Sequence, residues 1–383
     1  MSYSRFDVIV AGTGSMGSAA CYYLAARGCS VLGLEQNPTI PHELGSHTGQ
    51  SRIIRKAYFE HPGYVPLLEK AYQNWRELEA KTGEQVYHKT GLLYTGPRQH
   101  PVIQGVKYAA NQFNIEVNEV SEPGKYPAFN TNTDNVLMLE TDAGFLLPEK
   151  AIRLYLEESV KLGVSIRTGE KLINWEKKDG ALKVHTNRDT YLTSKLIITT
   201  GAWASQLSPN FQIPLTVTRQ LVFWVEPPDP ERYFPERFPC WMTAAEDLPG
   251  VWYGFPYLSG PDFPGPRGLK FAWHHAGEET DPEHVKREVS KEEIRALLKN
   301  AAGYFSPAVH PVVDVKTCLY TNTPDENFVI DRLPGYDGDL LIAWGFSGHG
   351  FKFASAVGEI LAAMACGEDS GLPTGFLSLD RFG

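Results

Sequence analysis

A glycine-rich turn near the start of the chain has the spacing of a dinucleotide-binding motif. Gly12, Gly14 and Gly17 follow a short apolar run, DVIVA, and precede a run of helical character. Gly12 suits a tight turn, Gly14 lets the backbone approach a pyrophosphate, and Gly17 allows the helix to pack closely. The first amides of the helix, from Ser15 and Met16 onward, would then face the phosphates. The pattern predicts a bound dinucleotide.

An acidic residue follows at the position where such motifs contact the ribose. A second apolar run, SVLGLE, ends in Glu35, which lies 18 residues beyond Gly17. A carboxylate here can accept hydrogen bonds from a ribose hydroxyl and disfavours a 2′-phosphate, so we do not expect NADP. Because strand, glycines, helix and acid all agree, they argue against the alternative of a glycine-rich turn without a ligand.

Two later glycine turns favour FAD over NAD as this dinucleotide. One follows KLIITT and contains Gly201 and Trp203; the other, in IAWGFSGHGFKF, contains Gly345, Gly348 and Gly350. Amides and a helix N-terminus in the second turn could approach the carbonyls of an isoalloxazine ring. Each turn alone could equally be an ordinary connection between a strand and a helix.

The elements that must position these turns alternate in character along the chain. Helices are expected over 65–82, 148–163 and 290–299, the last opened by a capping box of Ser290 and Glu293. Short strands are expected over 86–140 and 212–275. This order predicts an α/β (α+β) fold of two interleaved domains. The nucleotide-binding domain would comprise 1–88, 148–218 and 326–383, and a mostly antiparallel substrate domain would comprise 89–147 and 219–325.

The composition of the chain argues against several classes of binding partner. The 383 residues carry a formal net charge of −9, which gives no overall attraction for nucleic acid or anionic lipid. No apolar run approaches the roughly 20 residues that span a bilayer, and the chain enters a strand-like run without a leader, so we expect a cytoplasmic protein. The cysteines are odd in number, scattered and without a CxxC pair, which argues against a disulfide framework or a metal site. Four of them are expected to be small buried apolar residues: Cys21, Cys29, Cys240 and Cys366.

Five segments in order closely resemble the monomeric sarcosine oxidase family, which includes N-methyltryptophan oxidase and pipecolate oxidase. They are GSHTGQSRIIRKAY from residue 45, YGFP from 253, GLKFAWH from 268, CLYTNTPDENFVID from 318 and GFSGHGFKF from 345. The resemblance implies a FAD domain of the glutathione-reductase type and a substrate domain on an antiparallel sheet. It also implies that sarcosine, water and O2 give glycine, formaldehyde and hydrogen peroxide.

Other activities stay open. The substrate could be N-methyltryptophan, L-pipecolate or a fructosyl amino acid, or electrons could pass to an acceptor other than O2. A flavin-bearing binding protein without turnover is the alternative from another class. The resemblance implies a monomer that acts on a small amino acid and O2.

The resemblance implies functional roles for four positively charged residues. Arg55 and Lys352 would bind the substrate carboxylate, since burying that charge unpaired is costly and Arg offers a planar fork. Arg52, expected one helical turn from Arg55, would set the charge near the flavin, and Arg52 and Lys352 would both contact the cofactor. Lys270 would activate oxygen, because a fixed ammonium stabilises the negative charge that forms on it. The alternatives are a solvated basic face for SRIIRK and a surface lysine at 270.

The remaining site residues also follow from the resemblance. Cys318 would form a thioether to the 8α-methyl carbon of the flavin, an attack that requires a thiolate. Tyr320, two residues on, would share its face of a strand. The substrate would meet Tyr253, His274, Tyr320 and His349, and the cofactor would meet Ser46; for the aromatic residues and histidines the alternative is a structural core role. The chain departs from many sarcosine oxidases at His47-Thr48, where they have two histidines, and this departure bears on flavin attachment.

Overall fold

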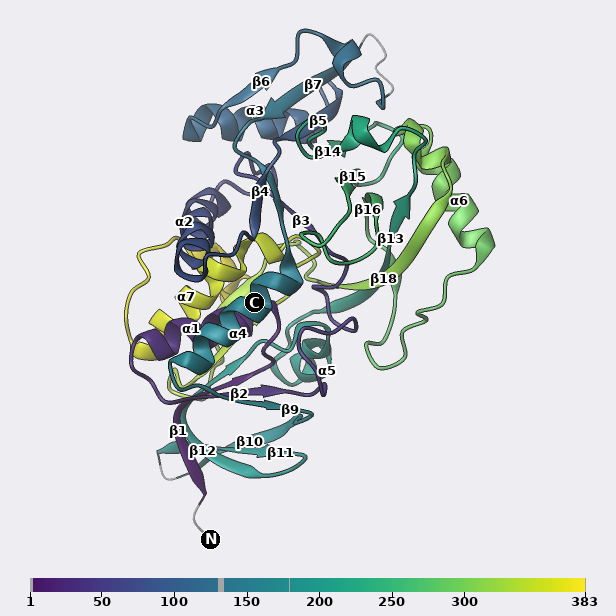
Figure 1. The fold of residues 1–383 in the computed structure, drawn as a ribbon. Coiled ribbons are helices and arrows are strands. Elements are labelled where there is room, and N and C mark those ends of the chain that lie inside the picture. The colour runs from purple at the N-terminus through teal and green to yellow at the C-terminus, as the bar shows by residue number, and fades with distance from the viewer. Residues whose placement is uncertain (1–2, 130–133, 179, 383) are drawn as a thin grey trace.

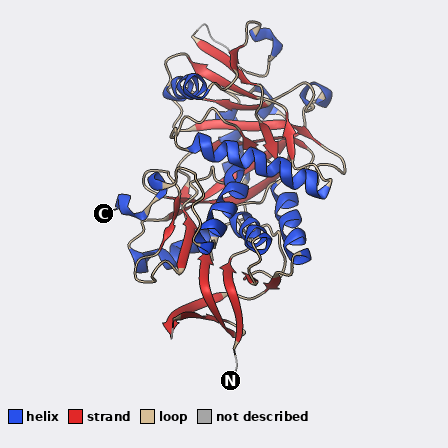
Figure 2. Ribbon diagram, turned by 90° about the vertical axis from the view of Figure 1, so that its left-hand side faces the viewer, coloured by secondary structure: helices blue, strands red, loops and turns tan. Residues whose placement is uncertain are grey.

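The computed structural model describes residues 3–129, 134–178 and 180–382, and two large sheets dominate it (Figure 1). The eight-stranded sheet lies at the end that carries the N-terminus, and the nine-stranded sheet lies at the opposite end. A third sheet has three strands in the order β3 (Arg52–Ile54), β8 (Gly144–Leu146) and β4 (Tyr87–Lys89). Figure 2 shows several long helices in the middle of the molecule, with strands toward both ends.

The eight-stranded sheet is built on a parallel core. Strands β12, β1, β2 and β9 lie side by side in parallel, and the other edge of β12 is shared by β11 and β20. The residues of β20 are all buried, as expected of a parallel strand covered on both faces. The strands are β1 (Ser4–Ala11), β2 (Val31–Glu35), β9 (Ser165–Thr168), β10 (Leu172–Lys178), β11 (Ala181–Thr186), β12 (Thr190–Ile198), β19 (Val329–Arg332) and β20 (Leu340–Trp344).

Four helices share one hydrophobic core with this sheet: α1 (Ser15–Ala26), α2 (Tyr64–Thr82), α4 (Pro148–Lys161) and α7 (Ala354–Cys366). Helices α1 and α7 approach so closely that a Cβ on Gly358 would lie 2.5 Å from the Cβ of Ala19. Only glycine therefore fits at this crossing. Near the C-terminal ends of the same two helices, the Sγ atoms of Cys29 and Cys366 are 3.7 Å apart. A short helix, α5 (Ala204–Leu207), follows β12.

The nine-stranded sheet is antiparallel except for the pairing of β14 with β5. Strand β13 pairs along its length with β18, and its other edge is shared by β16 and β17. The strands are β5 (Leu92–Pro97), β6 (Val117–Glu119), β7 (Asn135–Glu140), β13 (Thr216–Val225), β14 (Cys240–Thr243), β15 (Val251–Leu258), β16 (Gly268–His274), β17 (Glu278–Glu279) and β18 (Val312–Asn322). Two helices accompany this half, α3 (Pro101–Phe113) and α6 (Lys291–Ala301).

The mixed α/β fold with a second, largely antiparallel sheet is confirmed. The helices expected over 65–82, 148–163 and 290–299 are α2, α4 and α6. The Ser290 side chain accepts a hydrogen bond from the Glu293 amide at 3.1 Å, which is one half of the expected capping box. The Glu293 carboxylate instead pairs with Arg219 on β13, so this helix is attached to the sheet through its first turn.

Three local expectations were wrong. Helix α3 occurs where only short strands were expected; its interior Gly105 suggests a break but packs against Phe59, whose Cβ would lie 2.6 Å from an added Cβ. Arg52 and Arg55 are not a helical turn apart, because Arg52 lies on strand β3, which pairs with β8. Cys29 is only partly buried and Cys366 is exposed, since both lie at helix ends.

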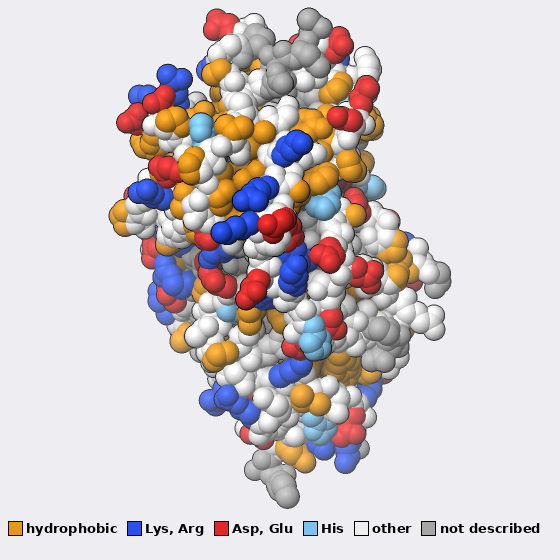
Figure 3. Space-filling view, turned by 90° about the vertical axis from the view of Figure 1, so that its right-hand side faces the viewer, with side chains coloured by type: hydrophobic (Ala, Val, Ile, Leu, Met, Phe, Trp, Pro, Cys, Tyr) orange, Lys and Arg blue, Asp and Glu red, His pale blue; other side chains and the backbone are white. Residues whose placement is uncertain are grey.

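The surface is mixed in charge. Figure 3 shows acidic and basic side chains interspersed on the face turned to the viewer, with hydrophobic side chains gathered mainly in its upper half. Among the described residues, the helices that are long enough to cross a bilayer are not apolar enough to do so.

Candidate active site

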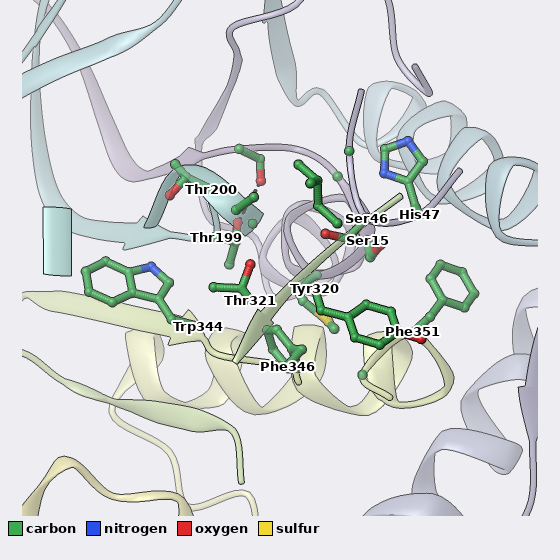
Figure 4. Close-up of a pocket in the computed structure, with 18 of the residues that line it drawn as sticks. Ser15, Ser46, His47, Thr199, Thr200, Tyr320, Thr321, Trp344, Phe346 and Phe351 are labelled. Atoms are coloured by element: carbon green, nitrogen blue, oxygen red, sulfur yellow. Dashed lines mark hydrogen bonds between the residues drawn. The ribbon is translucent and has the colours of Figure 1, made fainter. Parts of the chain in front are cut away.

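One cavity runs from the β1–α1 turn to the place where the two large sheets meet. Its lining comes from distant parts of the chain, including the loop around His47, the turn after β12, strand β18, and the end of β20 with the segment that follows it (Figure 4). Nearly all of the predicted site residues line it: Gly12, Gly14, Ser15, Met16, Glu35, Ser46, Arg52, Arg55, Gly201, Trp203, Tyr253, His274, Cys318, Tyr320, Gly345, Gly348, His349, Gly350 and Lys352. Gly17 and Lys270 lie behind this lining.

The β1–α1 turn has the geometry that the glycine spacing requires. Gly12 has φ +90, and a Cβ there would lie 2.6 Å from the carbonyl oxygen of Thr199. A Cβ on Gly17 would lie 2.0 Å from the carbonyl oxygen of Gly12. Any larger residue at position 17 would therefore prevent the helix from starting at this turn. An added Cβ on Gly14 would meet only the His47 ring, at 3.8 Å, which leaves the backbone open toward the cavity. The turn therefore presents the N-terminus of α1 to an anion.

Glu35 lies at the carboxyl end of β2 with one carboxylate oxygen engaged. Its Oε1 accepts hydrogen bonds from the backbone and side-chain nitrogens of Asn37, each at 3.0 Å, and lies 3.5 Å from Nε2 of His42. Burial raises the pKa of Glu35, but the hydrogen bonds from His42 and Asn37 outweigh it, and the pKa lies below its usual value. Within the described residues, Oε2 has no hydrogen-bond partner and can accept from a ribose hydroxyl.

Unpartnered polar atoms in the cavity wall test whether a dinucleotide fits. Thr200 Oγ1, Thr321 Oγ1 and Trp344 Nε1 are buried without a hydrogen-bond partner, and all three residues line the cavity. Figure 4 shows these residues, from three separate segments, around the same hollow. Buried polar groups normally have partners, so these atoms indicate a polar ligand. Together with the open glycine turn and Glu35, they fit FAD.

The loop before β3 wraps around the Arg52 guanidinium. Arg52 donates hydrogen bonds to the carbonyl oxygens of Ser46 at 2.9 Å, Ser51 at 2.8 Å and Thr48. Three carbonyl acceptors fix its position, and no carboxylate in the described part of the chain pairs with it. Arg52 therefore brings an uncompensated positive charge to the cavity wall.

Arg55, the next cation, is held within the protein. Its side chain is 2% exposed, with Nη2 2.5 Å from Oε1 of Glu60 and Nη1 donating to the Ala57 carbonyl at 2.9 Å. The rings of Tyr58 and Phe59 lie 4.2 and 4.4 Å from its Cζ. Oε2 of Glu60 is buried without a partner. The sequence analysis missed Glu60, although a carboxylate five residues beyond Arg55 was a signal for such a pair.

Lys352 reaches the same region from the segment before α7. Its Nζ donates to the carbonyl oxygen of His349 at 2.6 Å. Burial, reinforced by the positive charge of Arg55, lowers the pKa of Lys352 to about 7. One ring nitrogen of His349 forms a hydrogen bond with Tyr58 Oη, and the other forms one with the Glu326 carbonyl. Burial lowers the pKa of His349 to about 3. His349 is therefore neutral and fixed, and it supports the loop that carries Lys352.

Lys270 is buried next to the loop that holds Arg52. Its Nζ donates to the Ser51 carbonyl at 2.6 Å and lies 4.4 Å from the centre of the Phe255 ring. Burial and the nearby charge of Arg52 place the pKa of Lys270 well below its usual value. A surface position is therefore excluded. Neither Lys270 nor Ser51 is in the cavity lining, and the hydrogen bond to Ser51 places Lys270 directly behind the segment that carries Arg52.

Cys318, Tyr320, Tyr253 and His274 form one wall of the cavity. Cys318 and Tyr320 lie on β18 as expected, and Tyr320 Oη is 3.3 Å from Nδ1 of His274. Burial raises the pKa of Cys318, while the charges of Arg52, Lys270 and Arg287 oppose this rise. Burial lowers the pKa of His274 to about 4 and keeps Tyr253 protonated by raising its pKa. This wall thus carries neutral donors and a thiol close to three cations.

Taken together, the fold and the cavity define a dinucleotide-dependent enzyme with a buried cationic pocket beyond the nucleotide site. The comparisons with known proteins agree. Residues 7–364 match the family described as FAD dependent oxidoreductase. The chain belongs to this family, the predicted kinship with sarcosine oxidases is confirmed, and the protein is a flavoprotein oxidase that uses FAD.

Two relatives illustrate how far the similarity extends. The monomeric sarcosine oxidase of Streptomyces avermitilis is 37% identical over 381 residues, covering 98% of this chain and 97% of that protein. The N-methyl-L-tryptophan oxidase of Yersinia pestis is 31% identical over 385 residues, covering 98% and 99%. Among solved structures, NikD, an unusual amino acid oxidase essential for nikkomycin biosynthesis, has a TM-score of 0.84 with 20% identity, covering 98% of this chain and 97% of its own. That last likeness shows the fold.

Proposed function

We propose that the protein oxidises a secondary, N-methylated amino acid of the sarcosine type, with O2 as electron acceptor. The observation that supports this most is the pair of buried cations, Arg55 and Lys352, at the end of the cavity beyond the nucleotide turn. Two buried positive groups next to a redox cofactor suit the carboxylate of an amino acid. Sarcosine with water and O2 would then give glycine, formaldehyde and hydrogen peroxide. N-Methyltryptophan, L-pipecolate and fructosyl amino acids are the alternative substrates.

When bound, FAD would supply the two-electron redox chemistry by which a hydride equivalent leaves the carbon beside the amine nitrogen and O2 is reduced to hydrogen peroxide. The chain's own groups bind and orient the substrate. Arg55 and Lys352 hold its carboxylate, and the wall of Tyr253, His274 and Tyr320 faces the amine. The substrate must lose its ammonium proton before oxidation, and nearby positive charges favour that loss by lowering the pKa of the ammonium. Water then hydrolyses the imine that leaves the site.

We further propose that Cys318 attaches the flavin covalently. Its thiol lines the cavity; burial raises the pKa of Cys318, and the charges of Arg52, Lys270 and Arg287 offset only part of that rise. Acid precipitation tests the attachment: yellow colour should stay with the precipitated protein, and Cys318→Ser should release it to the supernatant. Colour found only in the supernatant of the wild-type protein would contradict the thioether.

The substrate is tested by mixing the FAD-loaded protein anaerobically with sarcosine, N-methyltryptophan, L-pipecolate and fructosyl glycine. The proposed activity requires that at least one of them bleaches the flavin absorbance and, in air, produces hydrogen peroxide. Sarcosine should act fastest. If the flavin stays oxidised with every amine, the protein is a flavin-bearing binding protein and the proposed function fails.

Lys270 provides a prediction that separates an oxidase from a dehydrogenase. Lys270→Met removes a buried amine whose protonated form would stabilise negative charge on oxygen, and it should slow reoxidation by O2 about 100-fold or more because that counter-charge is lost. Anaerobic reduction should change less than tenfold. Stopped-flow absorbance measures both steps separately, and an equal loss in the two would contradict this role.

We also propose a division of the chain into a FAD-binding domain of 1–88, 148–218 and 326–383 and a substrate domain of 89–147 and 219–325. The eight-stranded sheet falls in the first set and the nine-stranded sheet in the second, except that β13 begins at Thr216. A monomer working in the cytoplasm remains part of the proposal, supported by the similarity to the monomeric enzyme of Streptomyces avermitilis.

A further inference from the structure

Arg55 lies on an irregular segment, residues 55–63, that connects β3 to α2. This segment forms neither helix nor strand, so no regular secondary structure fixes its conformation. The Arg55 side chain is nevertheless buried and lies in the cavity wall. Its Nη1 donates to the carbonyl oxygen of Ala57, two residues further along, at 2.9 Å. The position of the guanidinium therefore depends on the position of the Ala57 peptide.

The Ala57 peptide is held by a carboxylate from the other half of the molecule. Glu140, the last residue of β7 in the nine-stranded sheet, is 0% exposed. Its carboxylate accepts the backbone N–H of Lys56 at 2.6 Å and that of Ala57 at 3.3 Å. Tyr94 on β5 donates its hydroxyl to the same carboxylate at 2.7 Å. Burial raises the pKa of Glu140, and the hydrogen bonds from these three donors offset only part of that rise.

The contacts form a continuous path from the nine-stranded sheet to the cationic pocket. Strands β5 and β7 pair next to each other, which fixes Tyr94 and Glu140 together. Glu140 fixes the amides of Lys56 and Ala57, and the Ala57 carbonyl fixes Arg55. The Lys56 ammonium forms an ion pair at 2.8 Å with Asp142, which lies two residues after Glu140 in the chain. This ion pair is a second contact that holds the same segment in place.

We infer that Glu140 is a positioning residue for the substrate carboxylate: it aligns Arg55 through the Lys56–Ala57 backbone without touching the substrate. This inference rests on the proposed function, in which Arg55 binds that carboxylate. A buried carboxylate at this place is otherwise hard to explain, since an apolar side chain of similar size would avoid the desolvation cost.

Glu140→Gln in the FAD-loaded protein tests the inference, because glutamine keeps the volume but replaces one acceptor oxygen with an N–H donor. That donor cannot accept from a backbone amide, so the Lys56–Ala57 peptides should shift. Anaerobic flavin reduction is followed at increasing concentrations of whichever secondary amino acid reduces the wild-type flavin fastest. We expect the apparent Kd to rise at least tenfold, while the limiting rate of reduction stays within threefold.

Two further variants act as controls. Glu158→Gln alters another buried carboxylate, on α4, that pairs with Lys161 and lies outside the cavity lining, and it should change neither parameter. Tyr94→Phe removes one donor to Glu140 and should raise the apparent Kd in the same direction but less. The thermal unfolding midpoint of each variant shows whether it is folded.

The inference is overturned if Glu140→Gln unfolds at a lower temperature but keeps the wild-type Kd, since that result describes a purely structural residue. It is also overturned if the Kd rises and the limiting rate of reduction falls by the same factor, or if Glu158→Gln changes the Kd as much as Glu140→Gln does. Arg55→Met separates this outcome from failure of the proposed function. If that variant binds the amino acid as tightly as wild type, Arg55 is not the carboxylate anchor and the assignment of the pocket itself is wrong.

Discussion

Arg55 already has a carboxylate partner within the protein. Glu60 occupies Nη2 at 2.5 Å, and its second oxygen is buried without a partner. Burial raises the pKa of Glu60, but the charge of Arg55 outweighs this and leaves the pKa below its usual value. In the proposed binding mode, a substrate carboxylate would have to share the guanidinium with Glu60 or displace it, and part of the binding free energy would be used in that exchange.

Glu60→Gln should consequently bind the amino acid more tightly. The glutamine keeps a weak contact with Arg55 but no longer competes as an anion, so the apparent Kd should fall about fivefold to tenfold, or about 1 kcal/mol. Anaerobic titration of the flavin absorbance measures it, with Glu292→Gln on the exposed face of α6 as a matched control. Weaker binding by Glu60→Gln would indicate instead that Glu60 contacts the substrate directly.

In the proposed binding mode, Lys352 should make substrate binding depend on pH. Burial and Arg55 lower the pKa of Lys352 to about 7, so its ammonium predominates at pH values well below 7, is half present at pH 7 and is lost as the pH rises further. A bound carboxylate favours the charged form, so the Kd should rise above pH 7 by up to tenfold per unit until the pKa of the complex is reached. In Lys352→Arg, which stays charged, this rise should disappear. A rise of the same size in both proteins would assign the pH dependence to another group.

Much of the site could be predicted from sequence because it is built from motifs whose residue types are chemically constrained. Gly12 and Gly17 are required by contacts below 3 Å, and such constraints are visible in the sequence. The spacing of Glu60 from Arg55 is only a weak signal for their ion pair, and Glu140 has no signal in the sequence, because its partners are backbone amides that lie opposite it only after folding. The sequence predicts a role for Lys270 in activating oxygen, but its position outside the cavity lining, bonded to the Ser51 carbonyl, depends on packing that no motif shows.

At the scale of elements, helix α6 offers a test of local stability without loss of function. Ser290 caps it, and Glu293 attaches its first turn to Arg219 on β13. Ser290→Ala should lower the free energy of unfolding by about 1 kcal/mol through loss of the cap. Denaturant titration measures this change. The Kd and the rate of flavin reduction should stay at wild-type values, because neither Ser290 nor Glu293 lines the cavity, and any change in them would show that α6 is coupled to the site.

The elements that sequence predicted well are those with a strong local signal. Helix α2 has apolar residues at helical spacing, and Gly83, which follows its last residue in a left-handed conformation, is a common helix terminator. Helix α3 was missed because Gly105 interrupts its pattern, and the need for that glycine comes from Phe59, a residue far from it in the chain. Strand β3 was predicted as a helical turn, because three residues are too few to distinguish the hydrophobic period of a helix from that of a strand. Its pairing with β8 determines its conformation.

At the scale of the whole molecule, the ends of α1 and α7 place two thiols within reach of each other. The Sγ atoms of Cys29 and Cys366 are 3.7 Å apart, and Cys366 is exposed. Diamide, which removes two hydrogens from a pair of thiols, should therefore link them, lower the molecular mass by about 2 Da and raise the thermal midpoint. Intact mass and thiol titration measure the link, and Cys29→Ser and Cys366→Ser should each prevent it. A link that forms equally in either variant would involve other cysteines.

The order in which the first sheet is completed has a consequence for synthesis on the ribosome. Strand β1 is translated well before its neighbour β12, which begins at Thr190, and before the next strand, β20, which begins at Leu340. Strand β1 can pair early with β2, but its other edge stays unpaired until β12 has been made, which favours chaperone contact over early folding. A message truncated before β20 would yield a product without the carboxyl-terminal wall of the cavity, and such a fragment should take up no flavin.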